Sequence, residues 1–226
     1  MKIALPAPAK ILFATLLGIV ATSGARADVV YSDATTDLNI RFNPGLVEVG
    51  DEIVLAGGAR QVTNFQFQYW GLNFGSTEKA RIRFYVNDGT NSPAGPQVPN
   101  SVLYDSDWFP IVATPRNTLI FDDFNDIAPG LQSVTVPDSF TWSVQFKDLA
   151  GGATAGVDLY DPPTVGGNYN EYWDNNGAAG WQYRGTNSPN INFAAKVSAI
   201  PEPTIIGLGL LGGLGLLVLR NRVKRR

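Results

Sequence analysis

The chain has 226 residues, contains no cysteine and no histidine, and carries a formal net charge of −3. The missing residue types exclude disulfides, zinc sites built from Cys or His, and nucleophile systems of the Ser-His-Asp or Cys-His kind. Residues 28–200 hold nine Lys and Arg residues against 19 Asp and Glu residues, so their net charge is −10 and we expect no nucleic-acid partner.

The first 27 residues have the three parts of a secretory signal peptide. Lys2 and Lys10 supply positive charge, residues 11–21 form an apolar run, and Ala25-Arg26-Ala27 places small residues at both ends of a cleavage site. We expect export through the Sec translocon and removal of residues 1–27 by signal peptidase, so that the mature chain begins at Asp28. An uncleaved N-terminal anchor is the alternative.

Residues 28–200 alternate apolar and polar side chains in many short runs, which is the pattern of half-buried β-strands. The clearest run is 140–146, where Trp142 falls on the apolar side and is expected in the core. Further runs are 38–42, 52–55, 65–69, 81–86, 102–108, 118–121, 134–136, 155–160 and 191–197. With no helical period anywhere between them, these runs predict an all-β domain over 28–200, a single antiparallel β-sandwich that is jelly-roll-like.

A Gly- and Asn-rich segment at 164–190 is expected to be a long loop at one end of the sandwich. Flat aromatic rings beside polar acceptors suit sugars, because the C–H faces of a sugar stack on a ring while its hydroxyls hydrogen-bond. The candidate glycan-binding residues of the aromatic loop 169–183 are Tyr172, Trp173, Asp174, Trp181 and Tyr183. The alternative is that Trp173 and Trp181 fold over the sandwich end and close its core.

Acidic residues cluster at 122–126, where Asp122, Asp123 and Asp126 are candidate calcium ligands because Ca²⁺ binds six to eight oxygens. Their spacing does not match an EF-hand loop, and Asp is also a favoured turn residue. No other metal or cofactor is expected. Paired carboxylates could support glycoside hydrolysis, but no motif selects a pair, so we expect no enzyme.

The last 26 residues combine three unlike pieces in a fixed order. Pro201-Glu202-Pro203 is followed by a predicted transmembrane helix over 204–219 and by a basic tail over 220–226. The basic residues of the tail are Arg220, Arg222, Lys224, Arg225 and Arg226. An apolar run followed by positive charge stops transfer with the basic end in the cytoplasm. The charge-free run 205–219 would span only about 22 Å as a helix, against roughly 30 Å of hydrocarbon.

This tail resembles the PEP-CTERM sorting signal of exported proteins in Gram-negative bacteria. Segments 49–57, 84–89, 103–106 and 160–163 also resemble parts of other exported proteins that carry this signal. The resemblance implies recognition by an exosortase, cleavage near the Pro-Glu-Pro triplet, and a host that produces exopolysaccharide or biofilm. It implies an inner-membrane intermediate, followed by release to the outer surface or the extracellular matrix. An ordinary single-pass anchor is the alternative.

Three hypotheses about function follow. The first is a non-enzymatic exported protein of the cell envelope or exopolysaccharide matrix, sorted by an exosortase. The second is a carbohydrate-binding module that uses the aromatic loop 169–183 and has exopolysaccharide as its partner. The third is a glycoside-active enzyme with paired carboxylates.

Overall fold

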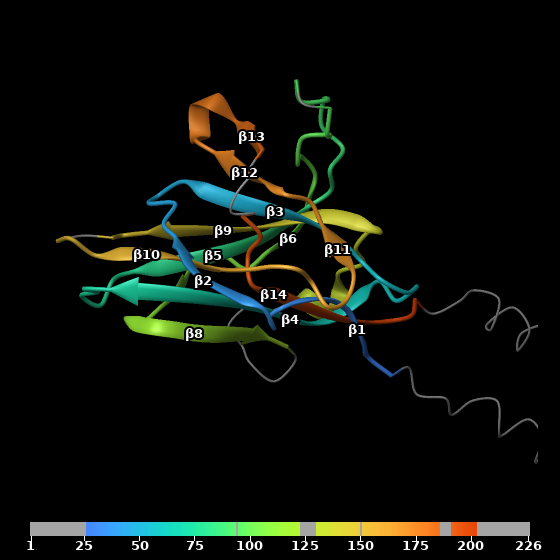
Figure 1. Cartoon of the computed structure of the whole chain (residues 1–226), viewed down its shortest axis with the longest axis horizontal. Coiled ribbons are helices and arrows are strands. Elements are labelled where there is room, and N and C mark those ends of the chain that lie inside the picture. Colours follow the sequence, from blue (N-terminus) through green and yellow to red (C-terminus); the bar gives the residue numbers. More distant parts are fainter. Residues whose placement is uncertain (1–25, 94, 123–129, 150, 186–190, 203–226) are drawn as a thin grey trace, which may run out of the picture.

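The alternating run at 140–146 forms the middle of a longer strand, β9 (Ser139–Lys147), in a computed structural model of the chain. The structure describes residues 26–93, 95–122, 130–149, 151–185 and 191–202. Over these residues the protein is all-β, as predicted, and its strands form two antiparallel sheets (Figure 1). Its described helical elements are two 3-10 turns, η1 (Leu131–Ser133) and η2 (Gly177–Ala179).

The two sheets, named A and B here, differ in size. Sheet A has six strands: β1 (Asp28–Asp33), β14 (Ala195–Ile200), β4 (Gln61–Leu72), β10 (Thr154–Tyr160), β2 (Asp37–Phe42) and, paired with β4, β8 (Thr114–Phe121). Sheet B has eight: β13 (Trp181–Gly185), β12 (Glu171–Asn175), β3 (Glu48–Val54), β9, β5 (Lys79–Tyr85), β6 (Val102–Asp105), β11 (Gly167–Asn168) on β3 and β7 (Phe109–Pro110) on β5.

Strand β4 organises sheet A because it pairs along both of its edges. Its residues 65–67 pair with both β14 and β8, so these two strands lie on opposite edges. Strand β10 pairs with the far end of β4, over residues 69–72, and pairs in turn with β2. The strand orders β2-β10-β4-β8 in sheet A and β3-β9-β5-β6 in sheet B result, with the chain crossing repeatedly between the sheets.

The core lies between the sheets and is mostly aromatic. Trp142 of β9 is 0% exposed, which confirms its predicted core position. Its ring centroid lies 5.2 Å from that of Phe65 on β4 and 5.9 Å from that of Phe193, so residues of both sheets meet in one cluster. Burying a side chain of this kind stabilises a fold by about 1.5–3 kcal/mol relative to leaving it in water.

Four of the predicted segments differ in the structure. The run predicted at 191–197 makes a single bridge, from Phe193 to Leu159, and becomes a strand only at Ala195. The strand predicted at 102–108 ends at Asp105, because Asp107 adopts a left-handed backbone (φ 54°) and its N–H bonds Asp105 Oδ1 at 3.0 Å. Residues 134–136 make a single bridge, from Thr135 to Gln61, rather than a strand. The loop predicted at 164–190 is wrong in part, since β11, β12 and β13 lie within it.

The two ends of the described domain lie side by side. Asp28 at the start of β1 is the register partner of Ala199 near the end of β14 (Figure 1). Pro201 and Glu202 follow β14 directly and are exposed. The signal segment up to residue 25, Pro203, the predicted helix at 204–219 and the basic tail at 220–226 lie outside the described residues. Among the described residues, the structure has no helix long and apolar enough to cross a membrane.

Candidate functional site

The segment predicted as an aromatic loop folds instead into a β-hairpin that extends sheet B. Its first strand, β12, pairs with β3, with Trp173 opposite Gly50, and its second strand, β13, pairs with β12. The Gly-containing turn η2 joins the two strands. Although β13 is at the edge of the sheet, its Trp181 ring lies 5.2 Å from the ring of Tyr85 on β5. The hairpin therefore curls over the outer face of sheet B, the face turned away from the core.

The predicted glycan-binding aromatic residues come together in this hairpin, but they divide between its two faces. Trp173, Trp181 and Tyr183 share the face that covers sheet B, with the rings of Trp173 and Tyr183 5.4 Å apart. Tyr172 is on the other face and contacts Phe42 at 5.1 Å. Trp173 is 0% exposed, so its ring is closed to a sugar. It lies on the outer face of sheet B, as the register partner of Gly50, and not in the core between the sheets.

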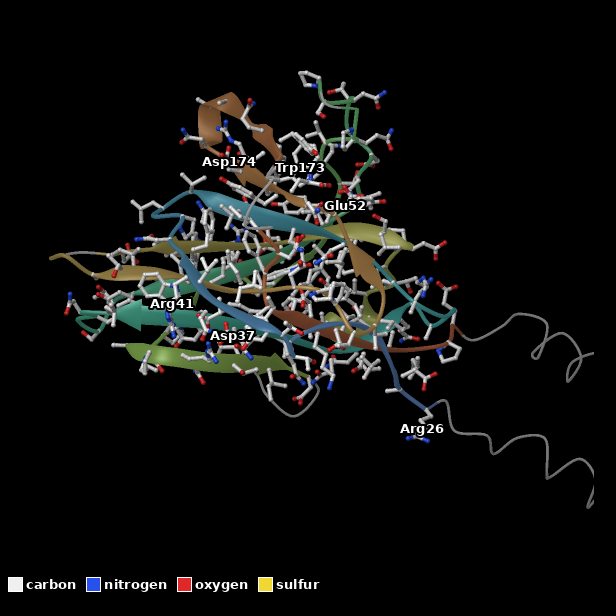
Figure 2. The ribbon with its side chains drawn as sticks, viewed as in Figure 1. Arg26, Asp37, Arg41, Glu52, Trp173 and Asp174 are labelled. Carbon is white, nitrogen blue, oxygen red and sulfur yellow. The ribbon has the colours of Figure 1, made fainter. Side chains whose placement is uncertain are left out.

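Asp174, the predicted polar partner of these rings, forms an ion pair at the surface. Its Oδ2 lies 2.6 Å from Nε of Arg184 on β13. Figure 2 labels Asp174 and Trp173 on the raised hairpin, with Glu52 of β3 nearby. Because Asp174 already has a cation, it is a poor acceptor for a ligand hydroxyl.

A buried carboxylate, Glu48 of β3, fixes the sheet beneath the hairpin. Its Oε1 accepts hydrogen bonds from Tyr85 OH at 2.9 Å and Ser143 Oγ at 2.6 Å, and its Oε2 accepts one from Asn175 Nδ2 at 3.2 Å. Nη1 of Arg83 lies 3.3 Å from Oε2. Burial and the Glu48 charge raise the pKa of the Tyr85 phenol well above its ordinary value, so it stays a donor. This carboxylate is fully paired and has a structural role.

A groove opens beside this network, between the hairpin and the segment that joins β5 to β6. Both features rise from the same side of the molecule in Figure 1. The groove, which we call the hairpin groove, has a volume of about 260 Å³. It is lined by Glu52, Asn87, Pro96, Gln97, Tyr169 and Glu171.

The groove brings two carboxylates together through strand register. Trp173 pairs with Gly50 in the β12–β3 ladder, and Glu171 and Glu52 each lie two residues beyond that pair, where both line the groove. Like charges held close together on neighbouring strands repel. Burial and the Glu52 charge raise the pKa of Glu171 to about 7. Burial and the charges of Glu171 and Glu52 also raise the pKa of Tyr183.

The polar groups of the groove are only partly satisfied. Ser139 Oγ donates to Glu52 Oε1 at 2.7 Å, and Thr141 Oγ1 donates to Asn87 Oδ1 at 2.7 Å. Within the described part of the chain, Asn87 Nδ2 has no acceptor and the Glu171 carboxylate has no hydrogen-bond or ion-pair partner. Tyr169 is 48% exposed at the rim. The groove therefore offers a ligand an aromatic face and two acids, whereas the unsatisfied Asn87 Nδ2 is itself buried.

Sequence reasoning found the hairpin aromatic residues but selected neither Glu52 nor Glu171, and Tyr169 was only the first residue of the aromatic loop. The signal it lacked was the pairing of β12 with β3, which brings these two distant segments of the chain together. The calcium candidates are not brought into this site. Asp122 is half-buried just after β8, whereas Asp123 and Asp126 lie outside the described residues. The described residues contain no group of three or more acids arranged to hold a metal ion.

A second set of acids lies buried at the opposite face of β3. Asp51 accepts a hydrogen bond from the Phe193 N–H at 2.9 Å, and Asp33 accepts one from Asn168 Nδ2 at 3.3 Å. Burial and the Asp161 charge raise the pKa of Asp33 to about 7. Burial also raises the pKa of Asp51. Both side chains are fully enclosed, so no ligand reaches them in this structure.

Comparisons of the chain with models of known protein families, with curated proteins and with solved structures gave no match. The assignment of function therefore depends on the chemistry of the hairpin groove and on the sequence patterns at the two ends of the chain.

Proposed function

We propose that the protein is a non-enzymatic exported component of the cell envelope or exopolysaccharide matrix, and that its β domain binds polysaccharide in the hairpin groove. The observation that carries the binding proposal is the groove itself, where the exposed Tyr169 ring lies beside the unpaired Glu171 carboxylate and the exposed Gln97 amide. A ring for the apolar face of a sugar, next to unsatisfied polar groups for its hydroxyls, is the combination that sugar recognition needs.

We further infer that the two sheets form a jelly-roll sandwich. The strand orders β2-β10-β4-β8 and β3-β9-β5-β6 support this, because two interlocked Greek keys in eight strands produce such orders. Strands β1 and β14 then widen one sheet, and the β12–β13 hairpin adds to the other. The hairpin groove is thus an addition to the sandwich and not a part of its core.

Processing at both ends is also proposed. The signal peptide 1–27 is removed after export through the Sec translocon, and the segment 201–226 is the exosortase signal. The recognised residues are Pro201, Glu202, Pro203, Arg220, Arg222, Lys224, Arg225 and Arg226. The exposure of Pro201 and Glu202, directly after β14, supports access by an enzyme. Before cleavage, the predicted helix at 204–219 holds the protein in the inner membrane with its C-terminus in the cytoplasm.

The sorting proposal is tested by fractionating the native host with and without its exosortase. We expect a shorter protein at the surface or in the matrix of normal cells and a longer one in the inner membrane of the deletion strain. Identical size and location in both strains would contradict the proposal.

The binding proposal is tested by co-sedimentation of the purified protein with the exopolysaccharide of its host. Tyr169→Ala should lose most of the sedimented fraction. Trp108→Ala is the matched control, since Trp108 is an aromatic residue packed by Arg81 and Lys147 at the opposite end of β5. Equal loss in both variants, or in neither, would refute binding at the groove.

A second candidate function, glycoside hydrolysis, is favoured by one observation. Glycosidases use two carboxylates whose environments separate their pKa values, and Glu171 is raised to about 7 next to Glu52. New reducing ends released from host polysaccharide by the protein, and abolished in Glu171→Gln, would establish it. Unchanged polysaccharide after prolonged incubation would eliminate it.

A further inference from the structure

The charge of the hairpin groove indicates which polysaccharide it selects. This inference rests on the proposed function, because it takes polysaccharide binding in the groove as given. We propose that the groove binds a polysaccharide that carries free, protonated amino groups, with one amino group held between Glu171 and Glu52.

The first support is that the charge of the groove has one sign. Its six lining residues include two glutamates and no lysine or arginine. The cations of the neighbouring strands have other partners, since Arg83 contacts Glu48 and Arg184 contacts Asp174. An acidic sugar would meet two carboxylates with no counter-ion, whereas an ammonium group would relieve their mutual repulsion.

The second support is that Glu171 is buried without a partner. The residue is 7% exposed, lines the groove and is given no donor or cation by the described residues. Buried carboxylates in proteins normally have partners, and an unsatisfied one is costly. The opening of the groove is the direction from which a partner can come, so the missing donor belongs to the ligand.

The third support is the surroundings of the acid pair. The Tyr169 ring provides an apolar face, and the exposed Gln97 amide supplies hydrogen-bonding groups for hydroxyls. A volume of about 260 Å³ is just under the usual range of small-molecule pockets, roughly 300–1,000 Å³, and fits one sugar unit of a longer chain. A divalent cation alone would find two carboxylates here, fewer charged oxygens than calcium sites usually provide.

The test is calorimetric titration of the purified full chain, in mild detergent, with three oligosaccharides of equal length. These are a glucosamine oligomer with free amines, its fully N-acetylated counterpart and an oligomer of a uronic acid. We expect the amine oligomer to bind at least 10-fold more tightly than the acetylated one, and the uronic acid oligomer not to bind. Added salt should weaken the binding of the amine oligomer and leave the binding of the acetylated oligomer unchanged.

Variants locate the effect. Glu171→Gln and Glu52→Gln should each weaken the binding of the amine oligomer by about 10-fold to 100-fold. This is the range expected for the loss of a charged hydrogen bond. Both should change binding of the acetylated oligomer by less than 2-fold. Asp174→Asn, which removes an acid of the same hairpin outside the groove, is the control and should change neither. Thermal unfolding of each variant checks that it is folded, and the comparison of ligands on the unaltered protein needs no variant.

The outcomes separate this inference from the function on which it rests. Equal binding of the amine and acetylated oligomers, or preference for the uronic acid, would overturn the amine proposal and leave polysaccharide binding standing. Oligolysine binding as tightly as the amine oligomer, or binding that requires calcium and is abolished by chelator, would also overturn it. Failure of every saccharide to bind, including host polysaccharide, would refute both.

Discussion

Replacing Glu171 by Gln should stabilise the protein at alkaline pH, although it removes a polar group of the proposed site. The folded pKa of Glu171 is about 7, raised from an ordinary value of 4.5 by burial and by Glu52. An acid whose folded pKa lies above its unfolded value holds its proton more tightly in the native state. Its full contribution to stability is therefore present below about pH 4.5 and is lost as the pH rises through 7.

The size of the effect follows from the pKa difference. A rise from 4.5 to about 7 corresponds to roughly 3.4 kcal/mol at about 1.36 kcal/mol per pKa unit. Because the carboxylate lines the groove, solvent screens part of this electrostatic energy. We therefore expect Glu171 to lower the free energy of unfolding by about 1–2 kcal/mol between pH 5 and pH 8. The Gln side chain of the variant does not titrate, so this position adds no pH dependence to the free energy of unfolding of the variant.

The assay is urea unfolding of the purified protein and of Glu171→Gln at several pH values from 5 to 8.5. Asp33, with a pKa of about 7, contributes to the slope of both proteins and cancels in the difference. The free energies of unfolding should be nearly equal at pH 5 and should differ by about 1–2 kcal/mol at pH 8, with the variant more stable. Parallel curves, or a variant less stable at pH 8, would refute the assigned electrostatics of the groove. A site that costs stability in the free protein is a common property of binding sites.

Four further substitutions test the fold around the site by the same measurement. Trp142→Ala should cost about 3–5 kcal/mol, since it empties the centre of the core, and a loss under 1 kcal/mol would contradict its placement. Gly50→Ala should cost about 1–3 kcal/mol, because the new Cβ would lie 2.6 Å from Thr141 Cγ2; an unchanged midpoint would contradict this close approach of β3 to β9. Glu48→Ala should cost about 3–5 kcal/mol, because it breaks the buried pair with Arg83 and removes the acceptor of Tyr85 and Ser143, whereas Arg184→Ala, at the exposed pair with Asp174, should cost under about 1 kcal/mol. Similar costs for these last two would contradict the difference in burial.

The all-β class could be predicted from the sequence because the strongest strands have one buried and one polar face. In β9 the alternation from Phe140 to Phe146 follows the pleat, and the buried residues point to one core. Strand β12, with the sequence Glu-Tyr-Trp-Asp-Asn, has no such alternation; it is also short and lies between Gly- and Asn-rich turns. Local composition therefore favoured a loop, and pairing with β3 overrode it.

The site could be predicted only in part, for a related reason. The sequence identifies the aromatic residues of the hairpin. It does not show which rings are exposed, because exposure depends on the face of the strand that each ring occupies. Trp173 is 0% exposed, while Tyr169 at the rim is 48% exposed. The Glu52–Glu171 pair depends on the register between strands far apart in the chain. A single sequence contains no information on that register when neither strand has a distinctive turn.

The most direct test of the central claim is amide hydrogen exchange on the purified protein, with and without fragments of the exopolysaccharide of its host. Polysaccharide bound in the hairpin groove should slow exchange at residues 95–98, around Glu52, and from Tyr169 through β12. The outer face of sheet A, including Gln66 and Gln68, should be unchanged. Protection confined to sheet A, or no protection at saturating polysaccharide, would contradict the claim that the groove is the binding site.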